Sequence, residues 1–222
     1  MAVLPLAVLV LLARIRPQRF GADAPFDVRW DLGLAALGGL VFMGVSFFYL
    51  ADYFLQGGPV TGADFHDYCA CVGASRGDHD GGWRATRSFA SGVVPAVLAR
   101  RFGVVDGLLI GAMLSQWILG AGIVLWGRAL HSRLAGLAAV ILACGVAPLT
   151  SLGRTVSFYP EIMAVFVLAA ALCVLALRTG SRWVVLSAGV MVGLSLLMDV
   201  RAIVWALPMI AVLGLAIFRM PS

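Results

Sequence analysis

Lysine is absent from this chain of 222 residues, and charged residues of either sign are scarce. Only 12% of the residues are charged, about half of the share typical of soluble domains, whereas 62% are hydrophobic. The basic residues are all arginines, and they stand beside apolar runs instead of gathering in one basic stretch. The scarcity of charge excludes an ordinary soluble domain, and the scattering of the arginines argues against nucleic acid as a partner.

Long uncharged runs predict the membrane spans. Six runs are present: Leu32–Leu50, Gly107–Gly127, Leu134–Gly153, Ile162–Leu177, Trp183–Met198 and Ala202–Phe218. The first three are long enough to cross, since a bilayer takes about 20 residues of helix, and the last three need flanking residues to join them. We therefore expect an all-α integral membrane protein with about six transmembrane helices in one domain, residues 1–222, with five or seven spans left open.

The opening MAVLPLAVLVLL lacks the positively charged start of a cleaved signal peptide, because its arginines follow the apolar run. Such a short run is too short to cross a bilayer alone. We expect residues 1–30 to form an interfacial or cytoplasmic N-terminal segment, with a seventh span as the open alternative.

Arginine placement predicts the orientation of the spans, since short cytoplasmic loops carry an excess of arginine and lysine. Nine arginines fall on one side of a single alternating topology: Arg14, Arg16, Arg19, Arg29, Arg128, Arg133, Arg178, Arg182 and Arg219. We expect this side to be the cytoplasmic face of a bacterial inner (plasma) membrane. Residues 56–102 then form a large extracytoplasmic loop, and the apolar stretch at its end predicts short juxtamembrane helices.

The outer loop contains a polar stretch rich in metal-ligand types, TGADFHDYCACVGASRGDHDGG. The candidate ligands are Asp64, His66, Asp67, Cys69, Cys71, Asp78, His79 and Asp80. Cys69 and Cys71 are separated by one residue, which fits neither the usual spacing of a zinc site nor a relaxed mutual disulfide. A hard cation held by carboxylates fits this stretch better. For the RGDHDGG part we favour a solvated turn over metal ligation.

Acidic residues recur at the expected outer ends of the spans. They are Asp52, Asp64, Asp67, Asp106, Glu161 and Asp199. Ionisable residues beside the hydrocarbon are costly, and they suggest a functional site or a paired partner. For Asp52, Asp106 and Asp199 we favour interfacial anchoring and local ion pairs.

Three arginines are expected on the same outer side, Arg87, Arg154 and Arg201. Arginine binds phosphate through two parallel hydrogen bonds, so a lipid phosphate in the outer leaflet is a suitable partner. Binding of anionic headgroups without any catalysis explains the same residues equally well.

The order of these features follows a known pattern. A first span leads into an outer loop with D-x-x-x-Y at Asp64–Tyr68, followed by an arginine-to-proline segment at Arg87–Pro95. The stretch LWGRALHSRLAGLAAVILACGVAP precedes an outer loop that begins LGRTVSFYPEIMAVFVLAAAL, and WVVLSAGVMVGLSLLMDVRAI closes the series. Over Leu32–Leu213 this order resembles the N-terminal half of the GT-C class of membrane glycosyltransferases, the superfamily of protein O-mannosyltransferases and lipid A aminoarabinose transferases.

The resemblance implies a site at the outer face. Asp64 stands where the family has the general base for the acceptor hydroxyl. Glu161 stands where a second acidic residue helps to hold a divalent cation, Mg²⁺ or Mn²⁺, together with Asp64. Arg154 would contact the donor phosphate. The remaining substrate-binding residues that we expect are Asp67, Tyr68, Arg87 and Arg201.

The implied activity is that of an inverting glycosyltransferase, which moves a sugar from a polyprenyl-phosphate donor to an acceptor. Membrane lipids and the lipid-linked sugar are the expected partners. Enzymes of the class carry several more spans, and many have a second acidic residue where Phe65 follows Asp64. The sequence therefore leaves open an active module, a truncated or inactive one, and a non-catalytic membrane subunit whose outer loop binds a partner protein. A small transporter is least favoured, since the third and fourth runs show little polarity.

Overall fold

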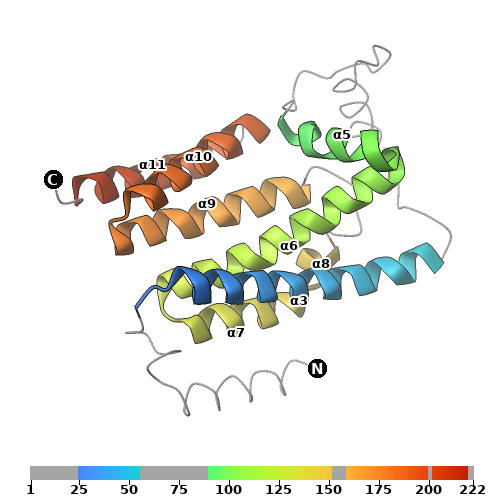
Figure 1. Ribbon diagram of the computed structural model, residues 1–222, viewed down its shortest axis with the longest axis horizontal. Coiled ribbons are helices and arrows are strands. Elements are labelled where there is room, and N and C mark those ends of the chain that lie inside the picture. The colour runs from blue at the N-terminus through green and yellow to red at the C-terminus, as the bar shows by residue number, and fades with distance from the viewer. Residues whose placement is uncertain (1–24, 56–89, 152–158, 200–201, 220–222) are drawn as a thin grey trace.

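The computed structural model of the protein describes residues 25–55, 90–151, 159–199 and 202–219 (Figure 1). Within these ranges the chain forms eight helices and no strand. The helices are α3 (Val28–Leu55), α5 (Ala90–Phe102), α6 (Val104–Leu130), α7 (Arg133–Cys144), α8 (Ala147–Ser151), α9 (Tyr159–Thr179), α10 (Arg182–Met198) and α11 (Ile203–Phe218). The all-α prediction is confirmed for this part of the chain.

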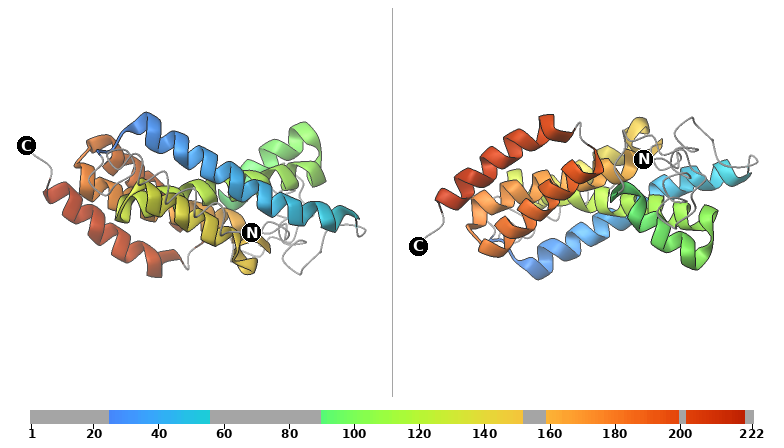
Figure 2. Two further views of the ribbon diagram at one scale, coloured as in Figure 1. Left: turned by 90° about the horizontal axis from the view of Figure 1, so that it is seen from below. Right: turned by 90° about the horizontal axis from the view of Figure 1, so that it is seen from above.

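Helices α3, α6, α7, α9, α10 and α11 run alternately in opposite directions, so the bundle has two ends (Figure 1). The arginine end is formed by the helix termini at Val28, Leu130, Thr179, Arg182 and Phe218, and the loop end by those at Leu55, Val104, Tyr159, Met198 and Ile203. Helix α6 lies at the centre, where it packs against α3, α5, α7 and α9 (Figure 2). Helix α9 also packs against α10 and α11.

Apolar packing falls into two clusters that share α9. The first joins α3, α6, α7 and α9 around Phe42 and Leu119. The second joins α9, α10 and α11 around Cys173 and Ala188. Alanines of α9 contribute to both clusters, and their small side chains let neighbours approach this helix on two faces. Cys173 is a small packing residue here, since it is buried and forms no disulfide.

Glycines allow the central helices to approach very closely. A Cβ at Gly120 of α6 would lie 2.6 Å from the Cβ of Phe42 and 3.0 Å from the Cα of Gly39, both in α3. A Cβ at Gly127 of α6 would lie 2.6 Å from the Cα of Gly136 in α7. Helix α6 therefore touches α3 and α7 at backbone distance, a type of packing that membrane helices use where small residues line the contact.

Three helices are long and apolar enough to cross a membrane. They are Val28–Phe47, Leu109–Leu130 and Tyr159–Thr179. These correspond to the first, second and fourth of the uncharged runs, and the fourth reaches spanning length because its flanking residues join the helix. Helices α10 and α11 are apolar but have only 17 and 16 residues. The chain thus has the helices of a membrane protein, while six spans stay a prediction.

The third uncharged run, Leu134–Gly153, is not one continuous helix as expected. Helix α7 ends at Cys144 after 12 residues, and the short α8 begins only at Ala147. Pro148 cannot prolong α7, because it has no N–H to donate and its ring collides with the preceding turn. The expectation is wrong because Gly145 and Pro148 interrupt a run whose apolar composition alone resembles a span.

The apolar end of the outer loop forms a helix, α5, as predicted. It lies against the first turns of α6, where the absence of a side chain on Gly107 makes room for the backbone of Ala99. Gly103 joins the two helices with a φ of 90°, a conformation that glycine adopts far more readily than other residues. The position of α5 on a membrane surface stays a prediction.

Candidate functional site

Glu161, the only glutamate of the chain, lies in the first turn of α9 at the loop end. It is 7% exposed, and Pro160 beside it is also buried. Proline suits this turn because the N–H that it lacks would have no partner within the helix. The backbone N–H groups of the first turn and the positive end of the helix dipole favour a carboxylate there. Pro160 and Glu161 thus lie in the first turn of α9, which begins at Tyr159.

The other residues of the predicted site lie outside the described residues. They are Asp64, Asp67, Tyr68, Arg87, Arg154 and Arg201. The ligand-rich stretch of residues 61–82 lies outside them as well. The roles of these residues and the distance between Asp64 and Glu161 therefore stay predictions.

The helix ends that carry these segments are described. Residues 56–89 connect α3 with α5, residues 152–158 connect α8 with α9, and residues 200–201 connect α10 with α11. The flanking helix ends are those that point away from the arginine end, with the ends of α10 and α11 near the middle of the bundle (Figures 1 and 2). Helices α5 and α10 are also in contact with each other. All three segments with predicted site residues are thus attached in the same half of the bundle as Glu161.

Two further acidic residues lie at helix ends in this half. Asp106 is exposed in the first turn of α6, where the helix dipole favours a negative charge. Asp199 follows α10, and its backbone carbonyl accepts a hydrogen bond from the N–H of Ala202 at 2.9 Å, which closes the turn into α11. These positions agree with the interfacial anchoring that the sequence favours for both residues.

A buried ion-pair cluster at the arginine end is absent from the sequence prediction. The Asp31 carboxylate accepts hydrogen bonds from Nε of Arg128 at 3.1 Å and from Nε and Nη2 of Arg133 at 2.7 and 3.1 Å. It also accepts from the backbone N–H of Asp27 at 2.8 Å, while Arg133 donates to the carbonyl of Pro25 at 3.0 Å. The three charged side chains are at most 7% exposed. They tie the start of α3 to the turn between α6 and α7.

From the sequence, Arg128 and Arg133 serve only to predict the orientation of the spans, and no role is predicted for Asp31. The pairs join residues 97 and 102 positions apart, so no local spacing announces them. One signal was present, since Asp31 stands directly before the first uncharged run, at Leu32. An ionisable residue at a span end calls for a partner, and arginines at the neighbouring span ends are the available ones.

The described arginines that we expect on the cytoplasmic side all lie at the arginine end. They are Arg29, Arg128, Arg133, Arg178, Arg182 and Arg219. Arg178 donates to the backbone carbonyl of Leu130 at 2.7 Å, which joins the end of α9 to the end of α6. This common end agrees with the alternating helix directions, and the side of a membrane that it faces stays a prediction.

A polar pair lies inside the contact between α3 and α6. The hydroxyl of Ser46 donates to Oε1 of Gln116 at 3.3 Å, and both side chains are buried. Among the described residues Nε2 of Gln116 has no acceptor. The neighbouring Trp117 donates from Nε1 to the carbonyl of Ala36 at 3.0 Å. These hydrogen bonds join α3 to α6 and help to fix how the two helices are oriented in an interface where small residues allow close approach.

No three potential metal ligands lie together within the described ranges of the chain. Of the two predicted cation ligands, Asp64 and Glu161, the described ranges contain Glu161, and a single carboxylate does not form such a site. The described residues therefore do not by themselves fit a bound cation.

Against protein-family models, curated proteins and solved structures, the chain has no match in any of the three comparisons. The likeness to GT-C glycosyltransferases therefore rests on the order of motifs in the sequence.

Proposed function

We propose that the chain is a GT-C-like glycosyltransferase module that uses a polyprenyl-phosphate sugar at the outer face of a bacterial inner membrane. The observation that carries the proposal is the position of Glu161. Its buried carboxylate opens a membrane-crossing candidate helix in the same half of the bundle where the segments with Asp64, Arg154 and Arg201 are attached. Residues from four separate parts of the chain thus have attachment points from which they can reach one substrate.

The proposed depth of the site suits a lipid-linked donor. Glu161 begins α9 at the loop end, so it would lie at the level of the headgroups if α9 crosses the bilayer. A donor phosphate at that level is reached by arginines of the adjoining segments, Arg154 and Arg201. Arginine neutralises phosphate charge without having to lose or gain a proton.

The proposed reaction uses one base and one leaving group. Asp64 takes the proton of the acceptor hydroxyl while the acceptor oxygen forms a bond to C1 of the sugar. The bond between C1 and the phosphate oxygen breaks, and the electron pair leaves with the polyprenyl phosphate. Arg154 stabilises the charge that develops on this phosphate. Attack on the face opposite the leaving group inverts the configuration at C1.

The proposal includes six spans with the loop of residues 56–102 outside. The distribution of the described arginines supports this orientation, because six of them lie at the arginine end, whereas two, Arg100 and Arg101, lie at the loop end with Asp106, Glu161 and Asp199. Positively charged ends of short loops are retained in the cytoplasm. The loop end then faces outward, together with the segments that carry the proposed site.

The experiment that tests the activity compares two aspartates of the same loop. The full chain is purified in lipid nanodiscs and supplied with radiolabelled polyprenyl-phosphate sugars and membrane acceptors. We expect Asp64→Asn to reduce transfer by about 10²-fold or more, the range that general-base catalysis contributes. Asp78→Asn, in the RGDHDGG turn, should leave transfer unchanged. Equal activity of the two variants would contradict the assignment of Asp64 as the base.

A chelation arm tests the proposed divalent cation. Transfer is measured after treatment with EDTA and again after addition of Mg²⁺ or Mn²⁺, for the natural chain and for Glu161→Gln. If Asp64 and Glu161 hold a cation, chelation abolishes transfer reversibly and Glu161→Gln shifts the cation concentration that restores it. Unchanged transfer in EDTA would remove the cation from the mechanism.

The alternative function is a non-catalytic subunit that binds a partner through the outer loop. Absence of transfer from every donor, together with a stable complex that is lost when residues 61–82 are replaced by a glycine-serine linker, would favour this alternative.

A further inference from the structure

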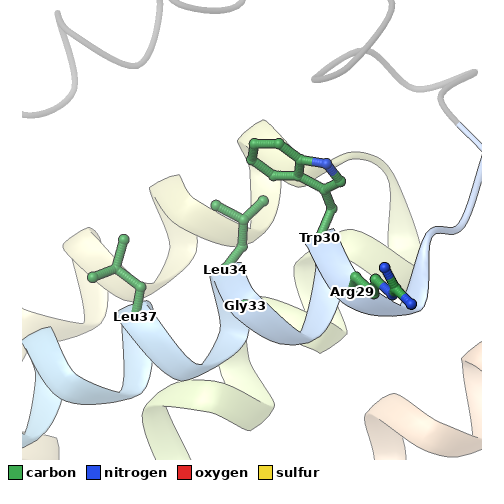
Figure 3. Close-up of a pocket in the computed structure, with 5 residues that line it drawn as sticks. All are labelled: Arg29, Trp30, Gly33, Leu34 and Leu37. Atoms are coloured by element: carbon green, nitrogen blue, oxygen red, sulfur yellow. The ribbon is translucent and has the colours of Figure 1, made fainter.

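An open groove of 310 Å³ runs along the first turns of α3 at the arginine end (Figure 3). It is lined by Arg29, Trp30, Gly33, Leu34 and Leu37. The side chains of Trp30, Leu34 and Leu37 point to the same side of the helix, as their spacing of four and three residues requires (Figure 3). Trp30 and Leu37 are exposed, so the groove opens to the surroundings of the bundle.

The lining changes from charged to apolar along the helix axis. Arg29 lies in the first turn, whereas Leu37 lies about 12 Å further along at 1.5 Å per residue. Between them, nothing lies within 4 Å of the position that a Cβ of Gly33 would take, so the floor of the groove is open. Since α3 is a candidate membrane span, its axis leads from the headgroup region into the hydrocarbon. A phospholipid presents its phosphate and its acyl chains in the same order.

The charge at the mouth of the groove favours an anionic lipid. No carboxylate among the described residues pairs with the Arg29 guanidinium. Asp31 is buried and holds Arg128 and Arg133, and Asp27 accepts from the backbone N–H groups of Arg29 and Trp30. Nearby carboxylates are thus engaged in other contacts, and the exposed arginines at this end raise the local positive potential.

We propose that this groove binds one anionic phospholipid of the leaflet at the arginine end. The lipid phosphate accepts hydrogen bonds from Arg29, the indole of Trp30 lies at the level of the headgroup, and an acyl chain follows Leu34 and Leu37. This site is separate from the loop end, so it depends neither on the transfer reaction nor on the identity of its donor. It adds a lipid requirement to the part of the protein that faces away from the proposed catalytic site.

Native mass spectrometry of the full chain tests the site. The probes are dioleoyl phosphatidylglycerol and, as a zwitterionic control, dioleoyl phosphatidylcholine, each titrated into detergent-solubilised protein. We expect one phosphatidylglycerol to remain bound in preference to phosphatidylcholine. Arg29→Gln should weaken this binding about tenfold, because it removes a charge-assisted contact with phosphate. Arg182→Gln removes an exposed arginine at the same end and should change the affinity less than twofold, because solvent and salt largely screen a distant exposed charge.

Three further arms separate this proposal from its competitors. Gly33→Leu fills the floor of the groove and should weaken binding of the lipid while the chain elutes as the natural protein does. Inorganic phosphate at millimolar concentration should not displace the lipid, since it lacks acyl chains. A benzophenone amino acid in place of Leu37 should crosslink to lipid on illumination. A crosslink to another part of the chain or to a second copy would overturn the proposal, as would equal affinity of the natural chain, Arg29→Gln and Gly33→Leu.

Discussion

At the scale of single residues, the carboxylate of Asp31 is shared by two guanidinium groups in a dry part of the bundle. A buried ion pair adds little net stability, because desolvation of the charges offsets most of their attraction. Removal of one partner is different, since it leaves the other charge buried without compensation. Asp31 therefore matters chiefly as a buried carboxylate that pairs with both Arg128 and Arg133.

We expect Asp31→Asn to lower the free energy of unfolding by about 3 to 5 kcal/mol, because two arginines then lose their buried counter-charge. The measurement is SDS- or heat-induced unfolding of the chain in mixed micelles, followed by circular dichroism. Asp27→Asn is the matched control, because it removes one negative charge from the same end at an exposed residue. An amide keeps the capping hydrogen bonds of this residue, so little stability is lost. Equal stability of the two variants would show that Asp31 is not a partner that the arginines need.

At the scale of helices, the contact between α3 and α6 depends on the absence of side chains. A Cβ at Gly39 would meet the backbone carbonyl and the indole of Trp117, whereas nothing lies within 4 Å of a Cβ at Gly44 on the same helix. The backbone of α6 cannot move aside as a flexible side chain can. Gly39 and Gly44 lower the helix propensity of α3 equally, but Gly39 is crowded by α6 and Gly44 has open space around it.

We expect Gly39→Ala to destabilise the bundle by about 1 to 3 kcal/mol, the usual cost of inserting atoms into a packed interface. Gly44→Ala should be neutral or stabilising by up to about 1 kcal/mol, because alanine is the better helix former. Both values come from the same unfolding assay as above. If Gly39→Ala proved as stable as Gly44→Ala, the close crossing of α3 and α6 would be disproved.

The helices also show what an apolar pattern predicts and where it stops. Uncharged runs of about 20 residues predict α3 and α6, and a shorter run with its flanking residues predicts α9, because a bilayer or a buried core selects for length and apolarity together. The same criterion fails at Leu134–Gly153, where Gly145 and Pro148 break the backbone inside an apolar run. Apolar composition indicates that a segment lies in an apolar environment, whereas single residues decide whether the helix continues through it.

The candidate site was predictable from sequence only in part. Glu161 is found where the pattern of Pro160 and a following apolar run places it, because the start of a helix is a local property. The pairing of Ser46 with Gln116, and which arginines pair with Asp31, were not predictable, because these partners lie 70 or more positions away. Such contacts are set by how the helices pack, and one sequence without a fold contains no record of them.

At the scale of the whole molecule, the arginine end and the loop end are separated by the length of α6. Its 27 residues extend about 40 Å, more than the thickness of the hydrocarbon layer. Phe102 and His131 are both exposed, and they lie just beyond the two ends of this helix. Their accessibility from each side of a membrane therefore reports the orientation of the bundle.

We expect Phe102→Cys to react with a membrane-impermeant maleimide in intact cells, and His131→Cys to react only after the membrane is permeabilised. Both are made in a chain whose native cysteines are replaced by alanine. The expectation follows from the gathering of arginines at the end that carries His131. Thr179→Cys, at the end of α9, should behave like His131→Cys. Reactivity of His131→Cys alone in intact cells would reverse the orientation and place the proposed site in the cytoplasm.

The ion pairs of Asp31 also set an order of events during synthesis. Asp31 emerges from the ribosome about a hundred residues before Arg133, since the two are 102 positions apart. Until the turn between α6 and α7 has been made, neither guanidinium that pairs with this carboxylate in the folded bundle exists, and we expect Asp31 to remain at the hydrated surface. Helix α3 can therefore enter the bilayer early but reaches its final depth and rotation only after the α6–α7 hairpin has arrived. Release of a truncated chain before Arg133 would leave the first span inserted but without its buried counter-charges.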